Sequence, residues 1–291
     1  EPFLGTFCSE HDEGLITGMT FWYAPGPAAD HLWVMDLGSA WPKLELLGSI
    51  PYDVKGAYTP IVGDFDGDVC TDILWYAPGS APDSIWWGEP GGGFTAEPIA
   101  INGTYQALTG HYADNERYNA EIFWYSTTGG TETIWSFDED RQLSVHSAPQ
   151  VSFSGYQVVS VNDDWPDTAL VFYQPGTGAD YVWGGVRAGE PAPERSIKIT
   201  INGTYQLIPH MWDLLLYAPG PAPDRLITRV HDDGTMDVVD ATINGTYRIA
   251  TFAPPILDPI LVFHTPGPGP DHVWTPGENH PGHEDNSQFL D

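Results

Sequence analysis

The apolar residues of this chain fall into short runs that are separated by turns rich in Gly, Pro, Asn and Asp. The clearest run, Asp72–Tyr76, is almost continuously apolar, as expected for a strand that is covered on both faces. A Pro-Gly turn at 77–82 and a second run at 83–87 follow it, which predicts a β-hairpin. With runs at 59–65 and 94–101 on either side, this segment predicts four short strands.

The same unit recurs six times along the chain, at spacings of 44 to 53 residues. The residues that precede the turns are Tyr23, Tyr76, Tyr125, Tyr173, Tyr217 and His264. The acids that follow the turns are Asp30, Asp83, Glu132, Asp180, Asp224 and Asp271. The residues three positions after these acids are Trp33, Trp86, Trp135, Trp183, Ile227 and Trp274. Four strands in a repeat of this length are the signature of a β-propeller blade.

We therefore predict an all-β, six-bladed β-propeller with four antiparallel strands per blade. A seventh blade supplied by another chain is the alternative. One domain is expected over 1–277, and its units are placed at about 1–57, 58–104, 105–155, 156–204, 205–246 and 247–277. The tail at 278–291 has little strand character, but it is the segment expected to close the last blade.

The charge balance argues against two classes of partner, nucleic acids and anionic membranes. The 291 residues include 40 Asp and Glu but only 10 Lys and Arg, which gives a formal net charge of −30. Such a field repels nucleic acid and anionic membrane surfaces, so neither is an expected partner. No apolar run approaches the roughly 18 residues that cross a bilayer, so no membrane insertion is expected. Low Lys with abundant Trp, Gly and Asp is typical of a secreted bacterial protein, and we interpret Glu1 as the start of a processed chain.

One loop, at 63–72, carries candidate chemistry. Its alternating acids in a Gly-containing turn would converge on one point, and a hard cation such as Ca²⁺ prefers six to eight such oxygen ligands. The candidate ligands are Asp64, Asp66, Asp68 and Asp72, with the backbone carbonyl of Cys70. The alternative is a solvated acidic turn without an ion. The sequence predicts a single structural calcium site.

The equivalent loops of the other units have lost most of these acids. The segments at 111–116 and 162–167 keep a few of them out of register, and metal binding there is left open. Calcium is therefore expected in one blade only.

The motif Gly-Asp-Phe-Asp-Gly-Asp at 63–68, followed by Asp72–Tyr76, resembles the FG-GAP/VCBS repeat of integrin-type propellers, especially the secreted actinobacterial type. The repeat register covers nearly the whole chain, whereas the calcium motif covers one unit. The resemblance implies a β-propeller with calcium between the first two strands of a blade. It also implies protein or glycan ligands, and some family members are fused to, or act as, polysaccharide-degrading enzymes.

The two cysteines, Cys8 and Cys70, fall in the same loop of neighbouring units. We expect a disulfide between them, and two separate thiols are the alternative. The tryptophans at fixed repeat positions are expected to pack between blades. Trp41 and Trp87 lie outside the shared register and are the candidates for exposed ligand-binding aromatics. The acid after each turn is expected to accept hydrogen bonds from backbone amides of its own turn.

No nucleophile elbow, zinc-protease motif or phosphate loop occurs in the sequence, so no catalytic residue is assigned. We predict a secreted, non-catalytic propeller that is stabilised by Ca²⁺ and binds a protein or a glycan. One alternative is a polysaccharide lyase or hydrolase with its site at the mouth of the propeller channel. Another is a structural subunit of an extracellular assembly formed by copies of this chain.

Overall fold

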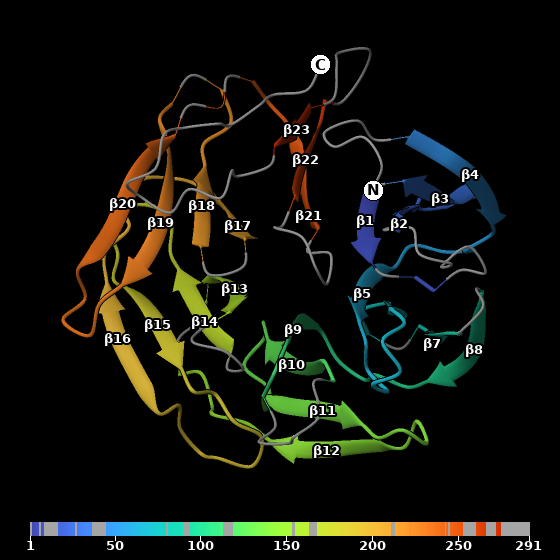
Figure 1. Ribbon diagram of the computed structural model, residues 1–291. Helices are drawn as coiled ribbons and strands as arrows, with labels where there is room; N and C mark the ends of the chain where they lie inside the picture. Colours follow the sequence, from blue (N-terminus) through green and yellow to red (C-terminus); the bar gives the residue numbers. More distant parts are fainter. Residues whose placement is uncertain are drawn as a thin grey trace. The chain divides into compact units, whose positions relative to one another are not determined.

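In the computed structural model, the described residues form 23 β-strands (Figure 1). The structure describes residues 2–5, 7–8, 17–26, 28–36, 45–79, 81–89, 93–112, 119–152, 155–162, 168–210, 213–220, 222–241, 243, 245–252, 260–265 and 272–274. These residues contain no helix, and hence none long and apolar enough to cross a membrane. The all-β prediction is confirmed for this part of the chain.

The chain divides into two compact units. Unit 1 comprises Glu1–Asp64, Asp68–Asn102 and Tyr247–Asp291, and unit 2 comprises Phe65–Gly67 and Gly103–Thr246. Each unit contains three antiparallel sheets, in which strands that follow one another in the chain are neighbours. This meander is the strand order of propeller blades. The expected single domain over 1–277 stays a prediction.

Unit 1 holds the first, second and last sheets. The first sheet consists of β1 (Pro2–Gly5), β2 (Thr17–Trp22), β3 (Asp30–Asp36) and β4 (Glu45–Tyr52). The second consists of β5 (Thr59–Gly63), β6 (Asp72–Tyr76), β7 (Asp83–Gly88) and β8 (Phe94–Ile99). The last consists of β21 (Arg248–Phe252), β22 (Ile260–His264) and β23 (His272–Trp274). Strands β1 and β21 lie side by side, so the first and last sheets are neighbours within this unit.

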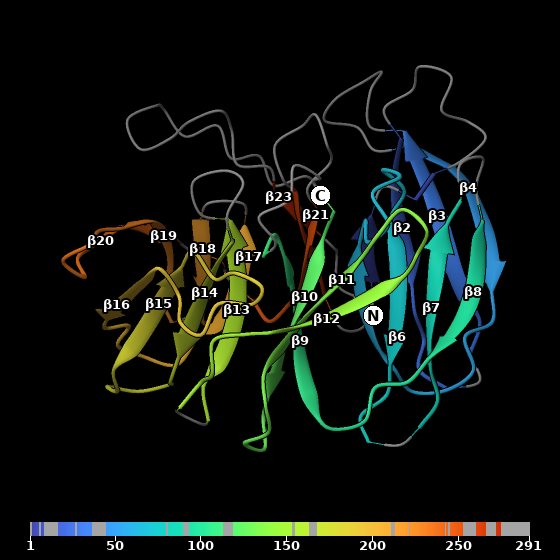
Figure 2. The same cartoon turned by 90° about the horizontal axis from the view of Figure 1, so that it is seen from below.

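Unit 2 holds three four-stranded sheets. The first consists of β9 (Tyr105–Gly110), β10 (Glu121–Ser126), β11 (Thr133–Phe137) and β12 (Leu143–Ser147). The second consists of β13 (Gln157–Asn162), β14 (Thr168–Tyr173), β15 (Asp180–Gly184) and β16 (Arg195–Ile199). The third consists of β17 (Gln206–His210), β18 (Asp213–Tyr217), β19 (Asp224–Val230) and β20 (Met236–Ala241). Strand β13 contacts both β9 and β17, so these sheets meet through their first strands, and β17 to β20 succeed one another outward in both views (Figures 1 and 2).

The predicted blade count is wrong. The described residues form five complete four-stranded blades and one sheet with only three strands, β21–β23, in place of six or seven four-stranded blades. The segment that was expected to complete the last blade, 278–291, lies outside the described residues. Its sequence is polar, with four Asp and Glu, two Asn and two His, and it lacks the alternating apolar residues that mark a strand in a half-buried sheet.

The second strand of each complete blade forms the core, as the apolar runs predict. Every residue of β6, β10 and β14 is buried, and Trp75 and Phe172 are fully inaccessible. These strands have a neighbour on each edge and a packed layer on each face, so an alternating polar pattern would place polar groups in the core. The repeated tryptophans pack as expected in two cases, since Trp86 and Trp183 both lie in inter-blade aromatic and aliphatic clusters.

In four of the complete blades, the aspartate after the hairpin turn links that turn to the end of the blade. In the second blade, Asp83 accepts hydrogen bonds from the amide of Ala77 in its own turn (2.8 Å) and from the amide of Ile101 after β8 (2.9 Å). The same pair of bonds is made by Asp30, Asp180 and Asp224. These aspartates are buried, and the interpretation of the repeated acid as a backbone ligand is confirmed.

The tyrosine before the turn adds a second link to the end of the blade. Tyr173 donates from its hydroxyl to the carbonyl of Gly203 (2.8 Å) and accepts from the amide of Tyr205 (3.0 Å). Gly203 has φ +136°, and a Cβ atom there would collide with the Tyr205 ring, so this Asn-Gly-Thr-Tyr turn needs glycine. The recurring triplet is thus explained by backbone geometry.

Candidate metal centre

The acidic loop connects β5 to β6. Gly63 and Asp72 face each other as the last paired residues of the two strands, so the loop begins and ends at one point. Gly67 (φ +80°) and Val69 (φ +68°) both have left-handed backbones, which reverse the chain within a few residues. Such tight reversals bring residues from both ends of the loop close together.

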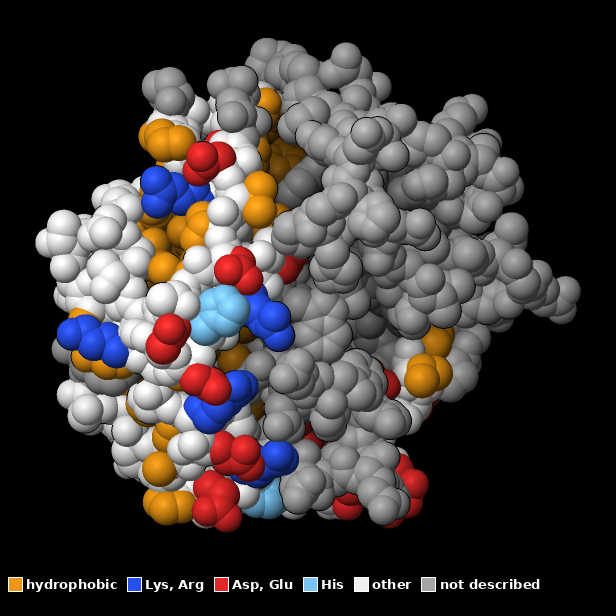
Figure 3. Space-filling view, turned by 60° about the vertical axis from the view of Figure 1, so that its left-hand side comes forward, with side chains coloured by type: hydrophobic (Ala, Val, Ile, Leu, Met, Phe, Trp, Pro, Cys, Tyr) orange, Lys and Arg blue, Asp and Glu red, His pale blue; other side chains and the backbone are white. Residues whose placement is uncertain are grey.

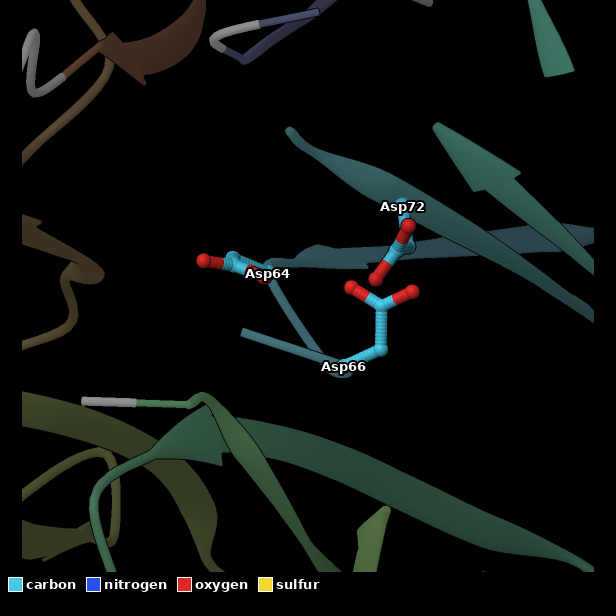
Figure 4. Close-up of side chains that lie close together, drawn as sticks. All are labelled: Asp64, Asp66 and Asp72. Carbon is cyan, nitrogen blue, oxygen red and sulfur yellow. The ribbon is translucent and has the colours of Figure 1, made fainter. Parts of the chain in front are cut away.

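Three of the four predicted acids converge. One carboxylate oxygen from each of Asp64, Asp66 and Asp72 lies within 4.8 Å of the others (Figure 4). Two oxygens on opposite sides of a calcium ion, each about 2.4 Å from it, are about 4.8 Å apart, so the three groups fit one coordination sphere. Within the described residues, this is the one group of three or more His, Cys, Asp or Glu side chains with such spacing.

The fourth acid has a different role. Asp68 does not join the cluster, and its carboxylate accepts a hydrogen bond from the amide of Cys70 at 2.8 Å. Asp68 therefore shapes the loop in the manner of an Asx turn. The expected contribution of the Cys70 carbonyl stays a prediction, as does the calcium ion.

Backbone amides orient two of the clustered carboxylates. Asp64 accepts from the amide of Val69 at 2.9 Å, across the loop. Asp72 accepts from the amide of Gly88, at the end of β7, at 2.8 Å, and its side chain is fully buried. These bonds fix the carboxylates in place without supplying a positive charge.

The tip of the loop, Phe65–Gly67, is held by the β9–β12 blade of unit 2. Phe65 is fully buried and its ring lies 6.2 Å from that of Phe137. Asn119 donates to the carbonyls of both phenylalanines. A Cβ atom on Gly67 would collide with the Asn119 side chain, so the loop packs this closely only because position 67 is glycine.

Arg141 supplies a counter-ion to the cluster. Its Nε lies 2.9 Å from Asp66, and the two side chains are 24% and 3% exposed. Like charges held this close together repel one another, and a divalent cation among them would offset the repulsion.

The expected disulfide is present. Cys8 and Cys70 are bonded, with their Cα atoms 5.2 Å apart, and 62 residues of chain separate them. The bond joins Cys8, in the β1–β2 connection, to Cys70 of the acidic loop, and both cysteines belong to unit 1. It therefore anchors the loop two residues before Asp72.

Of the two predicted ligand-binding aromatics, Trp87 is among the described residues and Trp41 is not. Trp87 is 1% exposed, so its assignment as an exposed binding residue is wrong. It lies in β7, where both faces of the strand are largely covered, and an aromatic outside the repeat register is buried there like its neighbours. Trp41 lies outside the described residues. So do 113–118 and 163–167, which hold most of the two degenerate loops, and metal binding there stays open.

Sequence reasoning missed Asn119 and Arg141. They lie 54 and 75 residues from the loop residues that they bond, and neither belongs to a motif. Only the packing of the β9–β12 blade against the loop tip brings them to the site.

Comparisons with known proteins add little. No family model matches the chain, so the FG-GAP/VCBS resemblance gains no support there, and no curated protein matches it. Among solved structures, a triple arginine-to-alanine mutant of AofleA from Arthrobotrys oligospora is similar over 100% of this chain and 90% of its own. The identity is 11% and the TM-score 0.47, a similarity too low to inform function.

Proposed function

We propose that this protein is a secreted, non-catalytic β-propeller of the FG-GAP/VCBS type, that one Ca²⁺ ion stabilises the loop at 64–72, and that the propeller binds a protein or a glycan. The observation that carries the proposal is the convergence of one carboxylate oxygen from each of Asp64, Asp66 and Asp72. Ca²⁺ prefers oxygen ligands, and carboxylates are prominent among them.

The role of the ion is structural in this proposal. The Cys8–Cys70 bond and the contacts of Phe65–Gly67 already hold the loop on both sides. An ion at the centre would remove the repulsion among Asp64, Asp66 and Asp72 and would stabilise the folded state in proportion to its occupancy. The disulfide also favours an oxidising, extracellular location, in keeping with secretion.

Thermal unfolding in the presence of calcium or a chelator tests the ion. We expect excess Ca²⁺ to raise the midpoint of the wild-type protein by several degrees, which corresponds to about 2–3 kcal/mol at a hundredfold excess over Kd. Asp72→Asn should abolish this rise while keeping an acceptor for the Gly88 amide. Asp68→Asn is the matched control, because Asp68 belongs to the same loop but not to the cluster.

Two results would contradict the calcium proposal. One is an unchanged wild-type midpoint together with no bound calcium by elemental analysis. The other is a loss of the calcium response in Asp68→Asn equal to that in Asp72→Asn. A stronger response to Mg²⁺ than to Ca²⁺ would keep the site but change the ion.

Ligand binding is tested separately on a glycan array, with and without chelator. If the ligand is a glycan, we expect binding to the array in the presence of Ca²⁺ and weaker binding when a chelator is added. No signal in either condition would exclude the glycan version and leave a protein ligand. Among the described residues, no specific observation favours the enzyme or the assembly alternative.

A further inference from the structure

A second candidate site lies in unit 2, between the β13–β16 blade and the β17–β20 blade. A cleft of about 400 Å³ separates their facing sides. Its walls include buried aliphatic side chains from both blades, among them Val171, Val182, Ile197 and Ile227. This volume falls within the usual range of small-molecule sites, which combine apolar walls with a few polar groups.

The mouth of the cleft is polar and contains two arginines. Arg195 of β16 and Arg229 of β19 both line it, with Thr228, His231 and Asp232 beside them. Figure 3 shows this side of the molecule, where basic, acidic and His side chains form a band next to apolar ones. The cleft thus offers an aliphatic interior and a charged, hydrogen-bonding rim.

Positive charge is scarce elsewhere, which makes this rim distinctive. The whole chain has 10 Lys and Arg, and five of them fall between 187 and 229. These five are Arg187, Arg195, Lys198, Arg225 and Arg229. Two arginines and Asp232 line the cleft, and Asp237 lies 3.2 Å from His231 of the rim, so the two signs balance here against a net charge of −30 for the chain. Anions are therefore repelled less here than over most of this surface.

The rim is held in place by the β19–β20 turn. His231 and Thr235 close this turn through a 2.9 Å backbone bond, and a Cβ atom on Gly234 would collide with the Lys198 carbonyl of β16. The turn therefore rests directly on the neighbouring blade. Across this contact, Arg195 lies 3.6 Å from Asp232, in an ion pair whose side chains are 45% and 87% exposed. Such an exposed pair is weak and can exchange for a ligand.

Arg229 has a different environment from the other arginines of this region. Arg187, Arg195 and Arg225 each have an ion-pair partner, whereas in the part of unit 2 that the structure describes Arg229 has none. Its guanidinium is therefore the group most able to bind an anion without first losing a partner. A guanidinium recognises a carboxylate best, because two parallel N–H groups match its two oxygens.

We propose that this cleft binds a hexuronate unit of an acidic polysaccharide. The carboxylate would meet Arg229 and Arg195, the hydroxyls would bond Thr228, His231 and Asp232, and the C–H face of the sugar ring would lie on the aliphatic wall. The aliphatic wall by itself does not distinguish ligands, whereas the rim supplies both the charge and the hydroxyl partners. This inference rests on the glycan version of the proposed function and names the ligand class and the site.

Titrations of the calcium-saturated protein test the inference, with binding followed by NMR. The probes are D-galacturonate and D-glucuronate, and their uncharged methyl esters are the matched ligand controls. At least one uronate should bind, and its ester should bind at least about tenfold more weakly, as expected for a charge-assisted hydrogen bond. Hexanoate has the carboxylate without the hydroxyls and should also bind more weakly. Affinity should fall as salt rises.

A pair of variants on one strand localises the site. Arg229→Gln should weaken uronate binding at least about tenfold, whereas Arg225→Gln, on the same strand but outside the cleft, should leave it within about twofold. The inference is overturned if neither uronate binds, if an ester binds as well as its acid, if hexanoate binds more tightly, or if the two variants behave alike. These outcomes are independent of the calcium response, which should be wild-type in Arg229→Gln, and of binding to other glycans on an array.

Discussion

The guanidinium of Arg141 lies 2.9 Å from the carboxylate of Asp66, whose side chain is only 3% exposed. The loop between β5 and β6 thus contains one permanent positive charge from the protein itself. This charge offsets part of the repulsion among the clustered carboxylates when no metal is bound. Arg141 and a bound cation would therefore stabilise the same loop. The contribution of Arg141 is permanent, whereas that of the cation depends on its concentration.

Replacement of this arginine should make the protein depend more strongly on calcium. Arg141→Gln leaves the buried Asp66 carboxylate without its partner, and the free energy of unfolding in chelator should fall by about 2 kcal/mol. The loss should be smaller in excess Ca²⁺, because the ion supplies the missing charge. Chemical denaturation in both conditions measures the difference. The control is Arg187→Gln, whose partner Glu194 is 61% exposed, and its effect should stay below about 1 kcal/mol. Equal losses with and without calcium would contradict the shared role.

Loss of the disulfide should destabilise the protein substantially. The bond closes a loop of 62 residues, for which chain entropy predicts a contribution of about 4 kcal/mol. We expect a double Cys8→Ser, Cys70→Ser variant to unfold at lower denaturant concentration than the oxidised wild type. A reducing agent should lower the wild-type midpoint and leave that of the variant unchanged. A reducing agent that shifts both proteins equally would show that the effect does not arise from this bond.

The buried aspartates Asp30, Asp83, Asp180 and Asp224 should be among the most sensitive positions of their blades. Asp224 accepts 2.7 Å bonds from the amides of Ala218 and Ile243, and Asp224→Ala would leave both buried amides without this acceptor. The expected loss in unfolding free energy is about 3 kcal/mol. Asp240→Ala, at an 88%-exposed side chain of the same blade, should change it by less than about 1 kcal/mol. Similar losses for the two variants would contradict the importance of the two hydrogen bonds that Asp224 accepts.

The pH dependence of stability should include a contribution from Glu132. Burial raises the pKa of this carboxyl, although backbone hydrogen bonds partly oppose the shift. A folded-state pKa above the unfolded value means that the stability from Glu132 is fully present below the unfolded pKa and is lost as pH rises through the folded pKa. Relative to Glu132→Gln, the wild type should therefore gain stability as pH falls from about 7 to about 4.

Thermal midpoints of both proteins across that pH range check this prediction. Measurements in chelator keep metal binding out of the comparison. The reverse trend, with the wild type losing stability relative to Glu132→Gln as pH falls, would mean that the carboxylate is better stabilised in the folded state than its burial implies.

Features that repeat along the chain were predictable, because six weak signals in one register reinforce each other. The apolar run of Asp72–Tyr76 and the hydrogen bonding of Asp83 are of this kind. The local loop signal also predicted that Asp64, Asp66 and Asp72 lie close together, as they do, whereas Asp68 of the same turn does not join them and the ion itself stays a prediction.

Features that depend on packing between distant segments were not predictable. Arg141 reaches Asp66 only because one blade packs against the loop of another, and no local pattern encodes that contact. Trp87 was expected at the surface because it breaks the repeat register, but burial is decided by the layers on both sides of β7. Sequence also overestimated the number of four-stranded blades, because the repeat marks the second and third strands much more clearly than the fourth.

The outer strands of the blades have a consequence for behaviour at high concentration. Strands β12 and β20 end their sheets, and Val145 and Val238 on them are 57% and 43% exposed. An open strand edge with apolar side chains is a template onto which a second molecule can add a strand. The acidic surplus keeps molecules apart at neutral pH, but this protection vanishes near the isoelectric point of about 4.2. Near this pH, folded molecules are therefore expected to associate through these edges.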